Sequence, residues 1–249
     1  MFRESGCPDL RTNRVGSNPT FRYSLPTCKG CSRAYLFLIK KFPVEKYMPT
    51  IRLTFVILVL TLTLSSCATY RPNQVANVCE IFRGETDWYE DALDANKRWG
   101  TPIGIMMAII KQESSFRDDV RPARPSFLFI PLPRRSSAYG YAQAQNPAWS
   151  DYQKATGNWG HDRDDFGDAI NFVGWYTHIS QQKLGISKWD PYKQYLAYHE
   201  GWGGYARGSF NKKPQLLRVA TKVQRQAETY NAQLKTCSKA LDKAVSGWF

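Results

Sequence analysis

The chain has 249 residues, of which 43% are hydrophobic and 14% aromatic. This is enough apolar material to bury a core, so the composition excludes a mostly disordered protein. The net charge of +13 is unevenly distributed: residues 1–66 hold ten Lys and Arg against three Asp and Glu, and residues 67–249 hold 24 against 18. In the second segment the basic residues are dispersed among acidic ones and form no stripe, so we expect no nucleic acid as a partner.

The longest apolar run, residues 53–64, reads LTFVILVLTLTL and follows Arg52. It is too short to span a bilayer, which needs about 20 residues, but its length suits the hydrophobic part of a signal peptide. The sequence Leu64-Ser65-Ser66-Cys67 resembles a bacterial lipobox, in which the cysteine is lipidated and becomes the N-terminus. We therefore predict a lipid on Cys67; the alternative is a short membrane anchor or a buried helix.

Met48 is an ordinary start for such a signal, so we interpret residues 1–47 as a non-native extension and residues 48–66 as a lipoprotein signal peptide. Residues 67–80 are expected to form a tether. Because Ala68 and not Asp follows the lipidated cysteine, we expect a periplasmic protein anchored through Cys67 to the outer membrane of a Gram-negative cell.

Two cysteines, Cys79 and Cys237, follow the proposed lipidation site. In an oxidising periplasm an even pair is a plausible disulfide, and this one would tie the two ends of the domain together. The alternative is two unpaired thiols.

From Ile81 onward the pattern is helical, with few β-branched alternations and no Asn-Gly hairpin signal. The class is therefore mainly α, in one domain over 81–237 followed by a C-terminal tail over 238–249. Thr101 is expected to cap a helix that has Pro102 at its first position. Four prolines make 121–137 a long loop. We predict helices over residues 85–99, 101–116, 168–184, from 190 to the glycines at 201–204, and 215–234.

Glu113 lies three and seven residues after Ile110 and Met106, so it continues the apolar face of its helix. Partial burial and the negative end of the helix dipole both raise the pKa of such a carboxyl, which favours a protonated general acid. The alternative is a structural Glu paired with Arg117 or rotated to the rim of the domain.

Three short motifs then follow one another in order. Gln112-Glu113-Ser114-Ser115-Phe116 resembles the Glu-Ser motif of the soluble lytic transglycosylases, the SLT domain of glycoside hydrolase family 23. Ala138-Tyr139-Gly140-Tyr141-Ala142-Gln143 is similar to that family's second motif, and Ala197-Tyr198-His199-Glu200-Gly201 resembles its third. The resemblance covers about residues 85–235.

The resemblance implies a lysozyme-like single domain with a substrate cleft. It also implies an enzyme that cuts the β-1,4 bond between N-acetylmuramic acid and N-acetylglucosamine in peptidoglycan and leaves 1,6-anhydromuramic ends. Glu113 would be the acid and then the base, and Tyr198 would hydrogen-bond to it. The implied substrate-binding residues are Ser114, Gly140, Tyr141, Gln143 and His199.

Two departures from the family pattern are Tyr141-Ala142 in place of Leu-Met and His199 in place of Asn. Two other readings stay open: a hydrolytic muramidase of the same fold, for which Asp164 or Asp165 would be the second carboxylate, and a non-catalytic peptidoglycan-binding lipoprotein. We also ask whether arginines of 121–137, such as Arg134 and Arg135, meet the carboxylates of peptide stems.

The three histidines are too scattered for ligand spacing, so we predict no metal and no cofactor. Asp162, Asp164 and Asp165 read as a solvated turn, with Asp168 capping the next helix. The expected partners are glycan strands of peptidoglycan and, through the lipid, a membrane. We expect a monomer.

Overall fold

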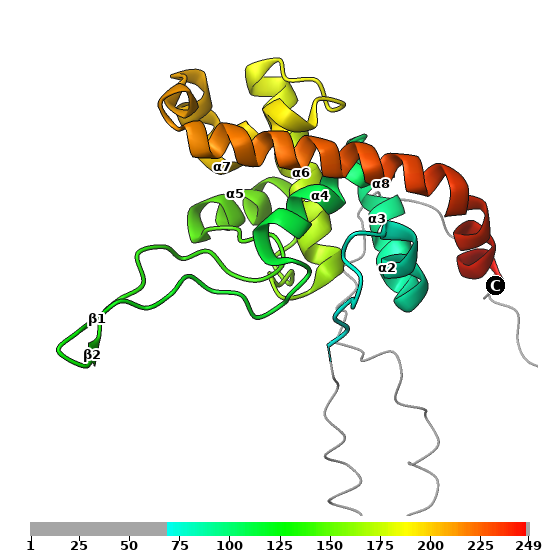
Figure 1. Ribbon diagram of the computed structural model, residues 1–249, viewed down its shortest axis with the longest axis horizontal. Coiled ribbons are helices and arrows are strands. Elements are labelled where there is room, and N and C mark those ends of the chain that lie inside the picture. The colour runs from blue at the N-terminus through cyan, green and yellow to red at the C-terminus, as the bar shows by residue number, and fades with distance from the viewer. Residues whose placement is uncertain (1–68, 248–249) are drawn as a thin grey trace, which may run out of the picture. The chain divides into compact units, whose positions relative to one another are not determined.

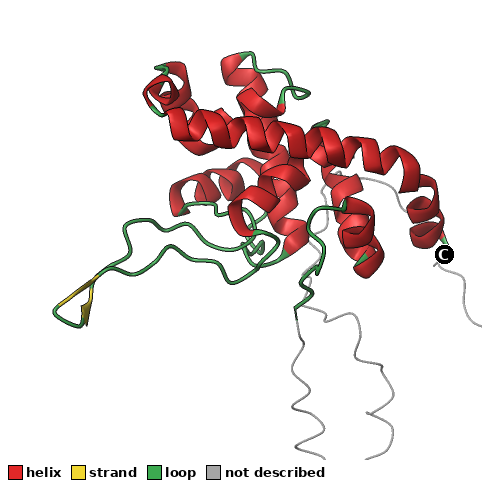
Figure 2. Cartoon of the chain, viewed as in Figure 1, coloured by secondary structure: helices red, strands yellow, loops and turns green. Residues whose placement is uncertain are grey.

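The computed structural model describes residues 69–247. The extension 1–47, the signal peptide 48–66 and Cys67 lie outside the described residues. The helices are α2 (Val78–Gly84), α3 (Thr86–Trp99), α4 (Ile103–Ser114), α5 (Asn146–Thr156), α6 (Phe166–Leu184), α7 (Pro191–Ala206) and α8 (Pro214–Ser246), with a short 3-10 helix η2 (Ser209–Lys212). Two strands of two residues each, β1 (Ser126–Phe127) and β2 (Ile130–Pro131), pair antiparallel. The expected mainly α class is confirmed (Figure 2).

Helix α4 forms the centre of the core. Its sequence is apolar on every face, and each residue from Gly104 to Ile110 is buried, whereas the sequence pattern predicted only one apolar face. It packs against α6 and along α8, which is the longest helix and crosses the domain (Figure 1). A Cβ on Gly104 would overlap the side chain of Asn231, so this glycine lets α4 and α8 approach closely.

Both ends of the domain differ from the sequence prediction. The predicted tether over 67–80 does not extend to residue 80, because α2 begins at Val78 and both Val78 and Cys79 are buried. The segment 238–249 is not a tail, because α8 continues to Ser246 and buries Leu241 in the core. A disulfide joins Cys79 to Cys237, across a sequence separation of 158 residues, and so ties α2 to α8.

Both predicted helix caps are wrong. Thr101 does not cap α4: it is buried, and its hydroxyl lies 2.7 Å from that of Thr177 on α6. Asp165, and not Asp168, caps α6 by accepting a hydrogen bond from the backbone N–H of Asp168. The helix expected from residue 190 is present, and Asp190 caps it by accepting from the backbone N–H of Lys193. The side chain of a threonine or aspartate near a helix start can bond either to a free backbone N–H of the helix or to another group, and tertiary packing decides between the two.

The proline-rich segment 121–137 forms an arm that projects from the helices, with β1 and β2 at its end (Figure 1). Leu128 and Phe129 turn the chain there with positive φ angles of 46° and 68°, and Phe129 is fully exposed. Arg121 stacks on the ring of Tyr139 at 4.0 Å and fixes the base of the arm.

Candidate active site

Glu113 occupies the last turn of α4. Ser115 and Phe116 follow with φ angles of 53° and 61°, which ends the helix, and Phe116 is fully buried. Burial of the Glu113 carboxyl raises its pKa from 4.5 to about 7, as its sequence position predicted, although the residue as a whole is partly exposed. The carboxyl therefore has a substantial protonated population at neutral pH, as a general acid requires.

The tyrosine that hydrogen-bonds to Glu113 is Tyr195, one helical turn before the expected Tyr198. This bond acts against burial and lowers the pKa of the Glu113 carboxyl. Tyr198 instead donates a 2.6 Å hydrogen bond to the backbone carbonyl of Ala142. Burial raises the pKa of the Tyr198 hydroxyl, and the carboxylate of Glu113 is close enough to raise it further. The sequence prediction for Tyr198 is therefore wrong as to its bonding partner.

The second motif forms a tight loop that depends on Gly140. This residue has a φ angle of 73°, and a Cβ on it would overlap the backbone carbonyl of Arg163. Its N–H donates to the carbonyl of Val120 at 3.1 Å. The side-chain amide of Gln143 donates to the carbonyls of Val120 and Gly140 at 2.9 and 2.8 Å. The loop is thus braced by its own polar groups, and Gln143 keeps its side-chain oxygen for another partner.

Two residues expected to bind substrate are buried in the core. Tyr141 is 2% exposed and packs edge-on against Trp88 and Phe166. Ser114 is also buried, and its hydroxyl bonds to the carbonyl of Ile110 in its own helix. Neither lines a hollow described below, so the structure does not support contact with substrate for these two residues.

The three motifs meet around His199, which borders two hollows on the surface. One hollow, of about 250 Å³, is lined by Gln143 of the second motif and by Tyr198, His199 and Gly201 of the third. The other, of about 630 Å³, is lined by Gln112 of the first motif and by Tyr195 and His199. Residues far apart in sequence therefore surround the region next to Glu113.

Glu200 also lines the smaller hollow, and sequence analysis gave it no role. Although burial acts to raise its pKa, hydrogen bonds from Lys213, Ser209 and His199 lower it to about 2. Lys213 lies 2.8 and 3.0 Å from the two carboxylate oxygens. The helix α7 breaks directly after it, at Gly201, with φ 71° and ψ 158°. Glu200 is therefore ionised, and its hydrogen bonds fix the end of the third motif in place.

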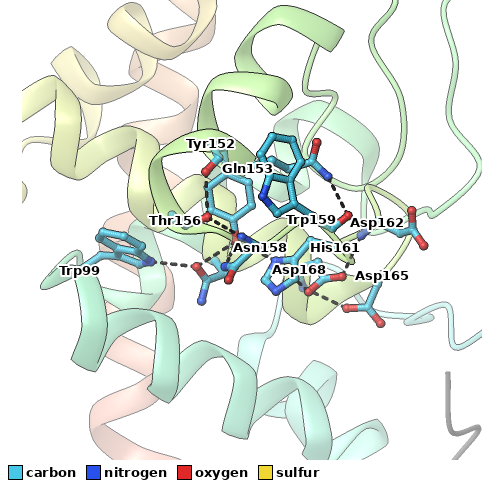
Figure 3. A network of polar contacts seen from close by, with 11 residues as sticks. Trp99, Tyr152, Gln153, Thr156, Asn158, Trp159, His161, Asp162, Asp165 and Asp168 are labelled. Carbon is cyan, nitrogen blue, oxygen red and sulfur yellow. Dashed lines mark hydrogen bonds and ion pairs between the residues drawn. The ribbon is translucent and has the colours of Figure 1, made fainter. Parts of the chain in front are cut away.

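Figure 3 shows the polar contacts of the acidic turn before α6, which also supports the second motif. The carboxylate of Asp168 accepts from the backbone N–H of Asp162 at 2.8 Å and lies 3.0 Å from His161. The hydroxyl of Tyr152 approaches His161 Nδ1 at 2.8 Å. The backbone carbonyl of Arg163, in the same turn, accepts from Tyr141 N–H at 3.1 Å, which joins the turn to the motif.

Asp164 and Asp165 are both engaged in this turn. Asp164 accepts a 2.7 Å hydrogen bond from the hydroxyl of Tyr139, and Asp165 caps α6. Neither lines the two hollows beside Glu113. The turn is thus built from fixed hydrogen bonds, and the expected cap at Asp168 is corrected to Asp165.

Over residues 69–247, no three or more His, Cys, Asp and Glu side chains are grouped to hold a metal ion. Within the same range, no helix combines the length and the apolar character needed to cross a bilayer.

A helical domain with a protonatable glutamate at a helix end, bordered by three motif segments, defines a lysozyme-like class of protein. Comparison with family models identifies the family: residues 55–237 match the Transglycosylase SLT domain, and the chain belongs to that family. A comparison with curated proteins gives no match. Membership of the family indicates a transglycosylase-type enzyme that acts on peptidoglycan.

Proposed function

We propose that this protein is a lytic transglycosylase that cleaves the β-1,4 bond between N-acetylmuramic acid and N-acetylglucosamine and forms 1,6-anhydromuramic ends. The observation that supports this proposal most strongly is the pKa of the Glu113 carboxyl, which burial raises to about 7. This carboxyl lies at the end of α4, near the two hollows described above. A group that titrates near neutral pH can give a proton and take one back in a single turnover.

In this mechanism Glu113 first protonates the glycosidic oxygen as the bond to C1 of muramic acid breaks. The resulting carboxylate then takes the proton of the C6 hydroxyl as that oxygen bonds to C1, which closes the anhydro ring and restores the acid. The positive charge at C1 is covered by the substrate's own N-acetyl group, so a second catalytic carboxylate is not needed. Tyr195 orients Glu113, and Gln143 and His199 border the path of the sugar chain.

A hydrolytic muramidase would need a second carboxylate free to act on water or on C1. Three carboxylates near the motifs are engaged elsewhere: Asp164 with Tyr139, Asp165 with the start of α6, and Glu200 with Lys213. This arrangement favours the intramolecular reaction. A pure binding protein has no use for a buried acid, since burying a carboxyl costs stability without adding to the affinity for sugars.

We also propose that Cys67 carries a lipid and that the domain works in the periplasm, anchored to the outer membrane as a monomer. The disulfide between Cys79 and Cys237 supports an oxidising compartment. Metabolic labelling with a radioactive fatty acid tests the anchor, because Cys67→Ala would abolish the label.

The activity is tested by digesting purified peptidoglycan with the protein and with Glu113→Gln, then analysing the products by mass spectrometry. Anhydro ends weigh one water less than reducing ends. We expect anhydro ends with the native protein and none with Glu113→Gln. Glu228→Gln is the matched control and should remain active: Glu228 is exposed on α8 and accepts a hydrogen bond from Gln224 of the same helix. Reducing ends would identify a muramidase instead.

A further inference from the structure

A groove runs along α8 beside the candidate active site. Three hollows form it, of about 470, 630 and 180 Å³. The first two share Arg218, the last two share Gln112, and the first and third share Lys222. Because they share lining residues, the three hollows adjoin one another, and we call them together the α8 groove.

The α8 groove lies next to Glu113, although Glu113 itself lines none of its three hollows. Gln112, which lines two of its hollows, directly precedes Glu113, and Tyr195, which bonds to Glu113, lines one of them. Helix α8 packs along α4 (Figure 1). The residues that line the groove come mostly from the first half of α8, and the others include Ala108, Lys111 and Gln112 of α4. A substrate group leaving the reaction centre on this side would enter the groove.

The lining of the groove carries positive charge and no carboxylate. Its cations are Lys111, Lys213, Arg218, Lys222 and Arg225, and none of the residues that line the three hollows is Asp or Glu. Lys213 is paired with Glu200. The other four form no ion pair with another residue of the described range 69–247. Uncompensated like charges side by side favour an anionic ligand.

The spacing of these residues is regular. Arg218, Lys222 and Arg225 lie at positions i, i+4 and i+7, so they share one face of α8 and extend over about 10 Å. Lys111 of α4 donates a 2.6 Å hydrogen bond to the side chain of Gln226 on α8. Burial and the charge of Lys222 lower the pKa of the Lys111 ammonium group. The groove thus offers several cations in a row, including two guanidinium groups that can each bind a carboxylate with two hydrogen bonds.

We infer that the α8 groove binds the carboxylates of the peptide stem carried by the muramic acid at the cleavage site. This rests on the proposed function, since the stem is attached to the sugar whose bond Glu113 would cut. Where a stem is attached, the lactyl carboxyl of muramic acid is bound in the amide bond to that stem, so the negative charges next to the cleavage site are those of the stem itself. The arginines of the arm were the earlier candidates, but none of the four hollows described here is lined by a residue of 121–137.

The test compares two substrates. The first is peptidoglycan that carries its stems. The second, called bare glycan, is the same material after an amidase has removed the stems and the lactyl carboxylates freed by that cut have been converted to methylamides. The groove variant is Arg218→Gln, Lys222→Gln and Arg225→Gln together. The matched control is Lys235→Gln, Lys239→Gln and Lys243→Gln, which removes the same charge from exposed positions of the same helix outside the groove. Binding is measured by co-sedimentation with Glu113→Gln present in every protein, so that no turnover disturbs it.

We expect the groove variant to lose on the order of tenfold in affinity for stem-bearing glycan. Its affinity for bare glycan should stay unchanged, and the control variant should match the parent on both substrates. An equal loss on both substrates, or no loss on either, overturns the inference. The proposed function fails separately, if the protein with Glu113 intact releases no anhydro ends from either substrate.

Discussion

The hydroxyl of Tyr198 donates a 2.6 Å hydrogen bond to the backbone carbonyl of Ala142. This bond connects α7 to the Gly140–Gln143 loop, which lies more than fifty residues earlier in the chain. Both segments line the hollow next to Glu113. Tyr198 thus positions the second motif, while Tyr195, one turn earlier on the same helix, contacts the acid itself.

Replacing Tyr195 by Phe should shift the pH dependence of activity. The Tyr195 hydroxyl lowers the pKa of Glu113, so its loss should raise that pKa above about 7 and move the alkaline limb of the kcat/KM profile to higher pH. The rate at the optimum should fall because the carboxyl loses its orientation. Tyr192→Phe, one turn earlier on α7, should leave the limb in place. An unmoved limb in Tyr195→Phe would show that this hydroxyl does not act on Glu113.

Gly140→Ala should destabilise the domain more than Gly157→Ala. Both glycines have nearly the same φ angle, 73° and 74°, so both substitutions impose about 1 kcal/mol or more of backbone strain. At Gly140 the new Cβ would also overlap the carbonyl of Arg163. At Gly157 it would have no atom of the described residues 69–247 within 4 Å, apart from those of the glycine and its two chain neighbours. We expect the free energy of unfolding in urea to fall by about 2–4 kcal/mol for Gly140→Ala. Equal losses in the two variants would contradict this reading.

Asp91→Asn should stabilise the domain at pH 8 and leave it unchanged at acid pH. The Asp91 carboxyl packs at the start of α6 against Gly167. Burial, followed by the charges of Asp165 and other aspartates, raises its pKa from 3.8 to about 7. The folded state therefore binds a proton more tightly than the unfolded state, and the free energy of unfolding falls as the pH rises from about 4 through about 7. The side chain of Asn carries no charge at any pH, so the variant does not lose this stability as the pH rises.

Because Asp91 is partly exposed, we expect a gain of only about 1–2 kcal/mol at pH 8. Thermal unfolding at pH 4 and pH 8 measures it. Asp151→Asn, at an exposed position on α5, is the control and should change stability little. A difference between Asp91→Asn and the native protein that does not grow with pH would refute the assignment.

Opening the disulfide between Cys79 and Cys237 should cost about 2–5 kcal/mol, because the bridge restricts a long segment of the unfolded chain. Urea unfolding of the protein with both cysteines replaced by Ser should show a lower midpoint. Adding a reductant to the native protein should lower its midpoint to the same value. A reductant that also lowers the midpoint of the double variant would point to a cause other than the bridge.

Much of the helical pattern was readable from sequence. The start of α7 at Asp190-Pro191 and the span of α3 follow from capping residues and apolar spacing, which are local properties. The segments α2 and α5 were missed because α2 has only seven residues and α5 begins without a side-chain cap. The true length of α8 was missed for a similar reason, since its last turns are mostly polar.

The candidate site also has residues that the sequence identifies and residues that only tertiary contacts reveal. Glu113 could be found because its helix phase and its motif point to it independently. Tyr195 carries no family signal in the quoted motif, although its spacing of three from Tyr198 places both on one face of a helix. Glu200 stands inside the motif, but only Lys213, from a later element, reveals that it is ionised and engaged.

By itself, the sequence determined the helical class and the family motifs, and it identified Glu113 as the candidate acid. Helix formation depends on neighbours along the chain, and three ordered motifs seldom occur together by chance. The tertiary structure alone decided which tyrosine contacts Glu113, that Tyr141 and Ser114 are buried, and that five cations line one groove beside the site. These properties depend on which side chains meet across helices, and distance along the chain does not determine distance in space.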